Sequence, residues 1–265
     1  MEKRTALAIE AYQQLMAAYA GRILPPNHYY SRMVKRVAER LIRVSGMEHL
    51  HWEFYVVEAR EANAFVLPGG KVFVFTGILP ICKNEDGLAA VLGHEIAHEL
   101  ARHTAERFSY AKILYAMNFT LYFLGLHSMM AKDFAINYLM MMPFSRKCET
   151  EADDIGLQLM SLACFDPREA VGLWERMEAV GASKLPQFFN THPSHENRFK
   201  NLSKKVRNTF LYLSYSGLGL TKIRYAHRYH FPLLQLPAAL QKRAESDCQT
   251  EMSTFDRFRK EWVRW

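Results

Sequence analysis

Two histidines and one glutamate near the middle of the chain have the spacing of a metal-binding motif. Residues 93–98 read Gly-His-Glu-Ile-Ala-His, an HExxH motif inside the strongest helical pattern of the sequence. Positions i and i+4 of a helix lie about 40° apart around its axis, so the imidazoles of His94 and His98 can converge on one zinc ion. Glu95 is turned by about 100° from His94, which places its carboxylate beside the ion as a general base. The motif predicts metal-assisted hydrolysis, and the alternative is a solvated helix surface without an ion.

A catalytic zinc ion takes three protein ligands and keeps one position open, so the sequence must supply one more donor. His103 comes five residues after His98, which turns it away from the face of the two ligands. It also does not match the longer HExxHxxGxxH motif, in which the third histidine comes one residue later. We expect His103 to be a helix-surface residue or to support a ligand.

An acidic helix start at 148–154 offers the remaining carboxylates. Glu149 and Asp153 share a helix face through their i, i+4 spacing, so one can bind the metal while the other hydrogen-bonds a ligating histidine. Glu151 and Asp154 are expected to point elsewhere. The alternative explanation of this segment is helix capping and a favourable interaction with the helix dipole.

The elements that must position these side chains indicate a mainly helical α+β fold with a small sheet beside the HExxH helix. Polar residues at 84–87 are suited to capping that helix, and Pro-Gly-Gly at 68–70 predicts a tight turn. The expected strands are 52–58, 65–67 and 71–76, and the expected helices are 5–20, 30–44, 88–110, 146–164 and 168–180.

The composition is that of a globular protein. The chain of 265 residues is 49% hydrophobic, which is enough for a full core. Its formal charge of +7 would favour an anionic partner, but we find no RNA-binding signature or long basic run and expect no nucleic acid. A basic surface that serves solubility is the simpler interpretation. The four cysteines include no Cys-x-x-Cys pair, so free thiols are expected.

One segment has the composition of a membrane-contacting helix. Residues 113–131 carry no formal charge, and as a helix these 19 residues would measure about 28 Å, just enough for a bilayer core. Polar side chains dilute this signal, so a buried or interfacial helix fits as well as a spanning one. Glu2 and Glu10 argue against a transit peptide or signal sequence at the N-terminus. Residues 209–265 lack clear periodicity and are interpreted as an extension.

The motifs together resemble a known family. HEIAH at 94–98, followed by Glu-Thr-Glu-Ala-Asp at 149–153, is similar to the paired HExxH and ExxxD signature of the HtpX-like and CAAX-prenyl-protease-like gluzincins. Three further segments bring the chain closest to the Oma-type metalloendopeptidases of the mitochondrial inner membrane. They are Asn-Ala-Phe-Val-Leu-Pro-Gly-Gly at 63–70, Ser-Arg-Lys at 145–147 and Thr-His-Pro-Ser-His-Glu-Asn-Arg at 191–198.

This resemblance, which runs from about Ala11 to Val206, implies a zinc metallopeptidase domain of the gluzincin type over residues 1–208. It implies one Zn²⁺ ion per chain, with Glu149 as the third ligand beside the two motif histidines. It also implies that Asp153 supports the site. The i, i+4 spacing of Glu149 and Asp153 already allows these two roles.

Three further residues receive roles from the same resemblance. His192 corresponds to a position that stabilises the oxyanion or holds the substrate, and Arg198 corresponds to its partner. A turn residue before a helix is the alternative for His192. Asn63 is expected to help align a substrate along the sheet edge, because proteases often bind peptides as an added strand, and a purely structural turn is its alternative.

The implied function is hydrolysis of peptide bonds in membrane or membrane-associated proteins, in mitochondrial quality control and stress response. The expected partners are protein substrates, membrane lipid and, as a further option, other copies of the chain. One alternative is an HtpX-like quality-control protease of another membrane. The other is a zinc-stabilised binding or chaperone-like module that has lost turnover.

Overall fold

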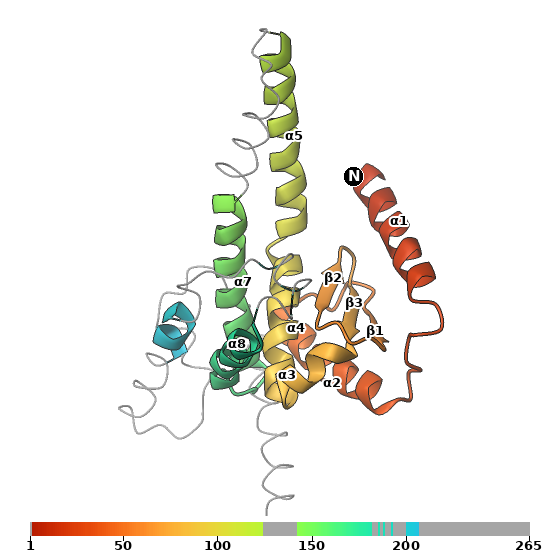
Figure 1. Cartoon of the computed structure of the whole chain (residues 1–265), viewed down its shortest axis with the longest axis vertical. Helices are drawn as coiled ribbons and strands as arrows, with labels where there is room; N and C mark the ends of the chain where they lie inside the picture. The colour runs from red at the N-terminus through yellow and green to blue at the C-terminus, as the bar shows by residue number, and fades with distance from the viewer. Residues whose placement is uncertain are drawn as a thin grey trace, which may run out of the picture.

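The computed structural model describes residues 2–123, 142–181, 185, 188, 192 and 200–206. Its elements confirm the mainly helical α+β class with a small sheet (Figure 1). The strands are β1 (Glu53–Val57), β2 (Ala64–Leu67) and β3 (Lys71–Phe75), followed by the short helices η1 (Thr76–Ile78) and α3 (Leu79–Cys82). The longer helices are α1 (Glu2–Ala18), α2 (Tyr29–Ser45), α4 (Glu85–Leu100), α5 (His103–Phe123), α7 (Met142–Leu162) and α8 (Arg168–Val180).

The sheet has the order β1-β3-β2, so β2 is an edge strand. β1 pairs with β3 in parallel, with Glu53 opposite Lys71, whereas β2 pairs with β3 antiparallel, with Ala64 opposite Val74. The predicted turn at 68–70 connects β2 to β3. Its glycines both adopt positive φ angles, 92° at Gly69 and 89° at Gly70, which few residues other than glycine adopt.

Helices cover both faces of this sheet. Side chains alternate along a strand, so Val72 and Val74 join the main core with α2 and α4, whereas Phe73 and Phe75 face the other way. Tyr19 at the end of the N-terminal helical segment packs edge-to-face on Phe75, with ring centroids 5.2 Å apart. Figure 1 shows the resulting order, with the sheet between α1 and α4.

The HExxH helix begins three residues earlier than predicted, at Glu85, and also ends earlier than predicted. Asn84 caps α4, because its side-chain oxygen accepts a hydrogen bond from the backbone N–H of Gly87 at 2.8 Å. The expected continuous helix over 88–110 is wrong, since α4 ends at Leu100 and α5 begins at His103. Arg102 between them has φ 57°, the left-handed conformation that closes many helices. Glycine or asparagine usually marks this position, so an arginine gave no signal of the break.

The two helices that carry the chemical motifs, α4 and α7, are in close contact at Gly93 and Gly156. A Cβ atom added to Gly156 would lie 3.1 Å from the carbonyl carbon of Gly93 and 3.1 Å from the backbone nitrogen of His94. Backbones can approach this closely only where side chains are missing. The contact brings the acidic half of α7 against the histidines of α4.

Helix α5 projects beyond the rest of the described fold (Figure 1). Its exposed apolar residues include Ile113, Phe119 and Phe123, with 63%, 65% and 72% of their surface accessible. Among the described residues, no helix combines the length and apolarity needed to cross a bilayer. Part of the uncharged segment 113–131 lies outside the described residues, as does the expected extension at 209–265.

The expectation of free thiols is confirmed for two cysteines and wrong for one. Cys82 and Cys148 are free and buried. Cys164 is disulfide-bonded. Spacing along the sequence carried no signal of this pairing.

Candidate metal centre

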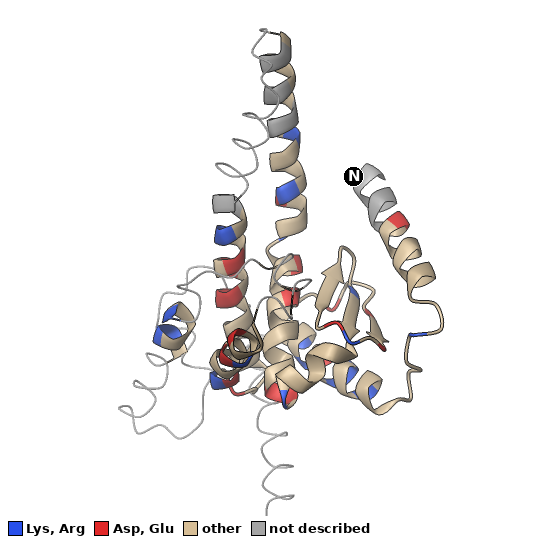
Figure 2. Ribbon diagram, viewed as in Figure 1, with Lys and Arg blue, Asp and Glu red and all other residues tan. Residues whose placement is uncertain are grey.

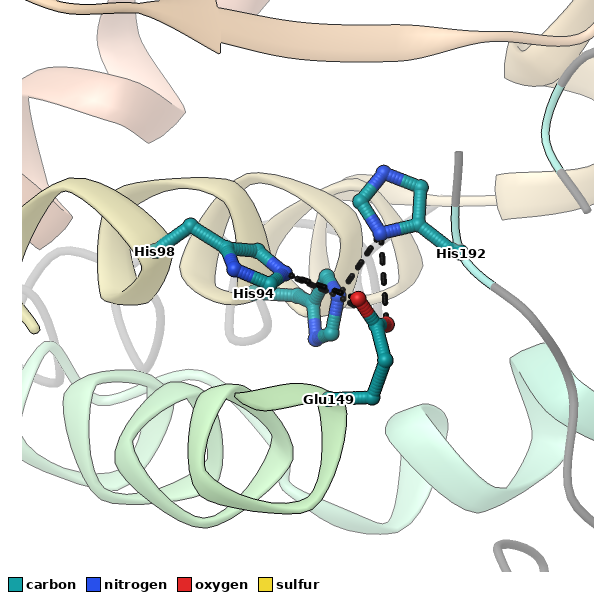
Figure 3. Close-up of side chains that lie close together, drawn as sticks. All are labelled: His94, His98, Glu149 and His192. Carbon is teal, nitrogen blue, oxygen red and sulfur yellow. Dashed lines mark hydrogen bonds and ion pairs between the residues drawn. The ribbon is translucent and has the colours of Figure 1, made fainter. Parts of the chain in front are cut away.

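Three donor side chains from α4 and α7 meet at one point. Both motif histidines project from the same face of α4, and Glu149 reaches them from α7 (Figure 3). The Nε2 atoms of His94 and His98 lie 3.0 Å apart. Oε2 of Glu149 lies 3.2 Å from Nε2 of His94, and its Oε1 lies 3.4 Å from Nε2 of His98. The convergence expected from the sequence is therefore present.

These separations match the edges of a zinc coordination tetrahedron. Zinc–nitrogen bonds of about 2.0–2.1 Å with tetrahedral angles place the donor atoms about 3.3–3.4 Å apart. The observed 3.0, 3.2 and 3.4 Å agree with these edges to within a few tenths of an ångström. The donor set, two imidazoles and one carboxylate, is also one that zinc prefers. The residues present fit the metal that the motif predicts.

His192 joins the same group from outside the two helices. Its Nδ1 lies 3.2 Å from Nε2 of His94 and 3.3 Å from Oε2 of Glu149. Together with His98, these residues can bring four ligand atoms within 4.8 Å of one another. The role expected for His192 was to stabilise the oxyanion or hold the substrate, and this ligand-like position was not foreseen. Its buried side chain faces Glu95 through the other ring nitrogen, with Nε2 lying 3.2 Å from Oε1 of Glu95.

Glu95 lies beside the donor group without belonging to it. Its side chain is only 4% exposed, and the candidate metal ligands are four other residues. This is the arrangement predicted from the 100° rotation between consecutive helix positions. A carboxylate held here can accept a proton at the edge of the site while leaving the donors in place.

Asp153 and His103 lie against the ring nitrogens of the motif histidines that face away from the donor group. Oδ1 of Asp153 lies 3.1 Å from Nδ1 of His94, the contact expected for a residue that orients a ligand. His103 is buried and its Nδ1 lies 2.8 Å from Nδ1 of His98. This contact agrees with the expectation that His103 supports a ligand, which stays a prediction. Figure 2 shows the acidic residues on α7 and on the adjoining part of α4.

Two acidic residues were expected to point away from the site. Asp154 does so and pairs with Lys205. Glu151 also stays outside the donor group, and its Oε2 lies 3.5 Å from Nε2 of His103. This contact was not foreseen, because a continuous helix over 88–110 would have carried His103 elsewhere. The break at Arg102 instead places His103 between α4 and α7.

Burial and neighbouring groups keep two of the donors, His98 and Glu149, in metal-binding protonation states. Burial, followed by the nearby imidazole of His94, holds the pKa of His98 far below its ordinary value. Burial alone would raise the pKa of Glu149, but contacts with His192 and His94 outweigh it and leave this pKa below the ordinary value. A neutral imidazole and an ionised carboxylate are the forms that bind zinc.

The remaining predicted residues are Asn63, which is not among the candidate metal ligands, and Arg198. Asn63 is buried next to β2, where its side-chain oxygen accepts a hydrogen bond from the backbone N–H of Ala64 at 3.0 Å. This contact fits the local turn role that was the alternative for Asn63. Arg198 lies outside the described residues.

The β2–β3 turn is tied directly to the HExxH helix. Oε1 of Glu99 accepts a hydrogen bond from the backbone N–H of Gly69 at 3.1 Å. Glu99 follows His98 in the sequence, so the last turn of α4 carries both a donor histidine and the contact with the sheet edge. No pattern in the sequence identified Glu99 as this link.

Comparison with known proteins places the chain in a family. The sequence profile of peptidase family M48 matches residues 30–206, well over half of the chain. The chain belongs to peptidase family M48. The M48 match covers the donors of α4 and α7 together with the sheet. Membership in this metallopeptidase family implies a bound metal, in agreement with the donor group.

Curated relatives bear out the resemblance to Oma-type enzymes. The mitochondrial metalloendopeptidase OMA1 of Schizosaccharomyces pombe is 49% identical over 205 residues, which are 77% of this chain and 60% of the relative. The protein of the same name from Saccharomyces cerevisiae is 41% identical over 211 residues, or 73% of this chain and 61% of the relative. The mitochondrial metalloendopeptidase OMA1 of Homo sapiens is 33% identical over 216 residues, or 74% of this chain and 41% of the relative. The chain therefore spans about 60% of the length of the two fungal relatives.

Proposed function

We propose that this protein is a zinc-dependent endopeptidase whose single zinc ion is held by His94, His98 and Glu149. One observation carries the proposal: donor atoms from two separate helices lie 3.0–3.4 Å apart, the spacing of a zinc tetrahedron, with Glu95 beside them. Membership in peptidase family M48 and the names of the relatives support peptide hydrolysis as the reaction.

The protein groups around the donors have distinct tasks in this reaction. When bound, zinc supplies Lewis acidity, which lowers the pKa of a water molecule from 15.7 towards about 7 and stabilises negative charge on oxygen. Glu95 takes the proton from the attacking water and passes it to the amine nitrogen that leaves. Asp153 orients His94 from behind, through the contact at Nδ1. His192 is proposed to stabilise the oxyanion, with Arg198 as its partner.

The substrate is proposed to bind as an additional strand on β2. This strand is the edge of the sheet in the described structure and packs against the HExxH helix. A peptide paired with β2 would run past the donor group, because Glu99 ties the β2–β3 turn to α4 beside His98. Backbone pairing of this kind binds an extended peptide with little dependence on its sequence. Asn63, next to β2, is proposed to help align it.

We further propose that the protein acts at the mitochondrial inner membrane, on membrane or membrane-associated proteins. The curated relatives are named as mitochondrial metalloendopeptidases, which supports the compartment. The exposed Ile113, Phe119 and Phe123 on the projecting helix α5, together with the net charge of +7, suit contact with an anionic leaflet. The metallopeptidase domain is assigned to residues 1–208, with 209–265 as an extension.

The deciding experiment measures zinc content and peptide turnover in the same preparation of the full chain. We expect one zinc per chain, cleavage of casein or a quenched peptide, and loss of cleavage on chelation with recovery when zinc is returned. Glu95→Gln should keep the zinc and lower kcat by about 10²–10⁴-fold, because only the proton acceptor is removed. Glu178→Gln changes an exposed carboxylate on α8 and serves as the matched control. Normal turnover in Glu95→Gln, or a chain that binds no zinc, would overturn the proposal.

A further inference from the structure

His103 makes a short contact with the second motif histidine that the proposed reaction does not use. The Nδ1 atoms of His103 and His98 lie 2.8 Å apart, with the ring planes inclined at 71°. His103 is the first residue of α5, yet its side chain is only 2% exposed. The left-handed turn at Arg102 directs this residue back towards the last turn of α4. A buried imidazole in this position requires a defined hydrogen-bond partner.

The proposed zinc site fixes the direction of this hydrogen bond. His98 offers Nε2 to the donor group, so a neutral His98 carries its single ring proton on Nδ1 and donates from there. Nδ1 of His103 must then accept, which leaves the proton of a neutral His103 on Nε2. That N–H faces the carboxylate of Glu151, with 3.5 Å between Nε2 and Oε2. This distance exceeds an ordinary hydrogen bond, and Nε2 of His103 has no hydrogen-bond partner among the described residues. The contact with Glu151 is therefore electrostatic.

His94 and His98 differ in how they are held. Nδ1 of His94 meets the carboxylate of Asp153 directly at 3.1 Å. His98 lies nearer to the end of α4, and its side chain is 17% exposed against 8% for His94. Packing alone therefore constrains the ring of His98 less, and a partner at Nδ1 has more to contribute to its orientation.

We propose that His103 and Glu151 form a relay that positions His98 for zinc binding, an inference that rests on the proposed function. His103 fixes the orientation and tautomer of His98, and Glu151 fixes the tautomer of His103. Both are positioning residues, since neither belongs to the donor group. The expected consequence is tighter zinc binding, because residues that orient a ligand typically contribute about 10–100-fold in metal affinity.

A second metal ion is the competing explanation for the same cluster. His103, Glu106 and Cys148 can also bring three ligand atoms within 4.8 Å of one another. An ion there would need the lone pair of Nε2 of His103, yet the contact with His98 assigns a proton to that atom. With neutral imidazoles, His103 cannot both accept a hydrogen bond from His98 and bind a second ion. The relay therefore predicts one zinc per chain.

The test compares the zinc affinity of full-length variants by competition with a chromogenic chelator. His103→Leu keeps the bulk but removes the acceptor, and should weaken zinc binding by about 10–100-fold. His103→Asn offers an amide oxygen close to the position of Nδ1 and should recover part of this loss. Glu151→Ala should weaken binding by less than His103→Leu, and Glu178→Ala on α8 should not change it. Absorption spectra of the cobalt-loaded proteins should shift for His103→Leu and remain close to wild type for His103→Asn.

These outcomes separate failure of the relay from failure of the zinc site. A wild-type chain that binds no zinc overturns both. A wild-type chain that binds zinc, with equal affinities in wild type, His103→Leu and Glu151→Ala, overturns the relay alone. Equal losses in His103→Leu and His103→Asn would also overturn it, because packing rather than the acceptor would then matter. Two zinc ions per chain, one of them lost in Cys148→Ser, would assign the cluster to a second metal.

Discussion

Gly156 of α7 lies against the backbone of Gly93 in α4, so closely that an added Cβ atom would be 3.1 Å from its carbonyl carbon. The contact is one residue from His94, and Asp153 precedes Gly156 on α7 by three residues. The separation of the two backbones therefore sets the distance between the histidine pair and the carboxylates that face it.

We expect Gly156→Ala to weaken zinc binding and to lower the melting temperature. Alanine normally stabilises a helix by up to about 1 kcal/mol relative to glycine. Here its methyl group would push α7 from α4 by a few tenths of an ångström and move Glu149 away from the histidines. Gly172→Ala in α8 is the matched control, since its added Cβ would meet only side-chain atoms of Arg176 and Glu169. Equal responses of the two variants would contradict the close-contact explanation.

Acid should destabilise the zinc-free protein mainly through His98. Because the pKa of His98 is lowered in the folded state, the unfolded chain binds a proton below about pH 6.5 that the folded chain does not. Stability should therefore fall as the pH falls through this region, by about 1.4 kcal/mol per pH unit for one proton. The lowered pKa of Glu149 acts in the same direction, but only below about pH 4.5.

Urea unfolding of the chelator-treated chain between pH 7.5 and 5 measures this slope. His98→Asn should flatten the profile in that range, because the group whose pKa is shifted has been removed. Glu149→Gln should leave this part of the profile unchanged and alter it only at lower pH. A slope that does not respond to His98→Asn would show that other groups control the acid response.

Substitution of His98 and substitution of His192 should differ in their effect on zinc binding. His98→Ala removes one of the three proposed protein ligands and should lose both zinc and turnover. His192→Ala leaves those three ligands intact and should retain one zinc per chain. Its kcat should fall by about 10²–10³-fold, the effect of removing one oxyanion donor. Zinc content and steady-state kinetics check both variants, and loss of zinc from His192→Ala would make His192 a required ligand instead.

Much of the site could be predicted from local spacing, and the rest depends on one backbone dihedral. The i, i+4 pairs at His94 and His98 and at Glu149 and Asp153 give shared helix faces, because helical geometry needs no knowledge of the tertiary fold. The buried position of His103 against His98 could not be predicted in this way. It depends on the left-handed conformation of a residue type that rarely adopts it, and propensity carries no signal for such an exception.

The same limit applies to contacts between elements. The glycines of α4 and α7 are visible in the sequence, but nothing local indicates that they face each other. The hydrogen bond from Gly69 to Glu99 likewise joins two segments that are 30 residues apart. The strands, a polar cap within 84–87 and the fold class follow from local patterns and were predicted correctly.

The left-handed turn at Arg102 yields the last prediction. A non-glycine residue in this conformation is strained by about 1–2 kcal/mol, and glycine relieves the strain while adding about 0.5–1 kcal/mol of chain entropy to lose on folding. Arg102→Gly should therefore leave the free energy of unfolding unchanged or raise it by up to about 1.5 kcal/mol, with zinc affinity intact. Arg102→Val, with a branched side chain at the same φ, should lower stability and weaken zinc binding, because α5 can no longer hold His103 against His98. Urea unfolding and chelator competition on both variants measure these effects. Normal zinc affinity in a destabilised Arg102→Val would show that zinc binding does not depend on the conformation of this turn.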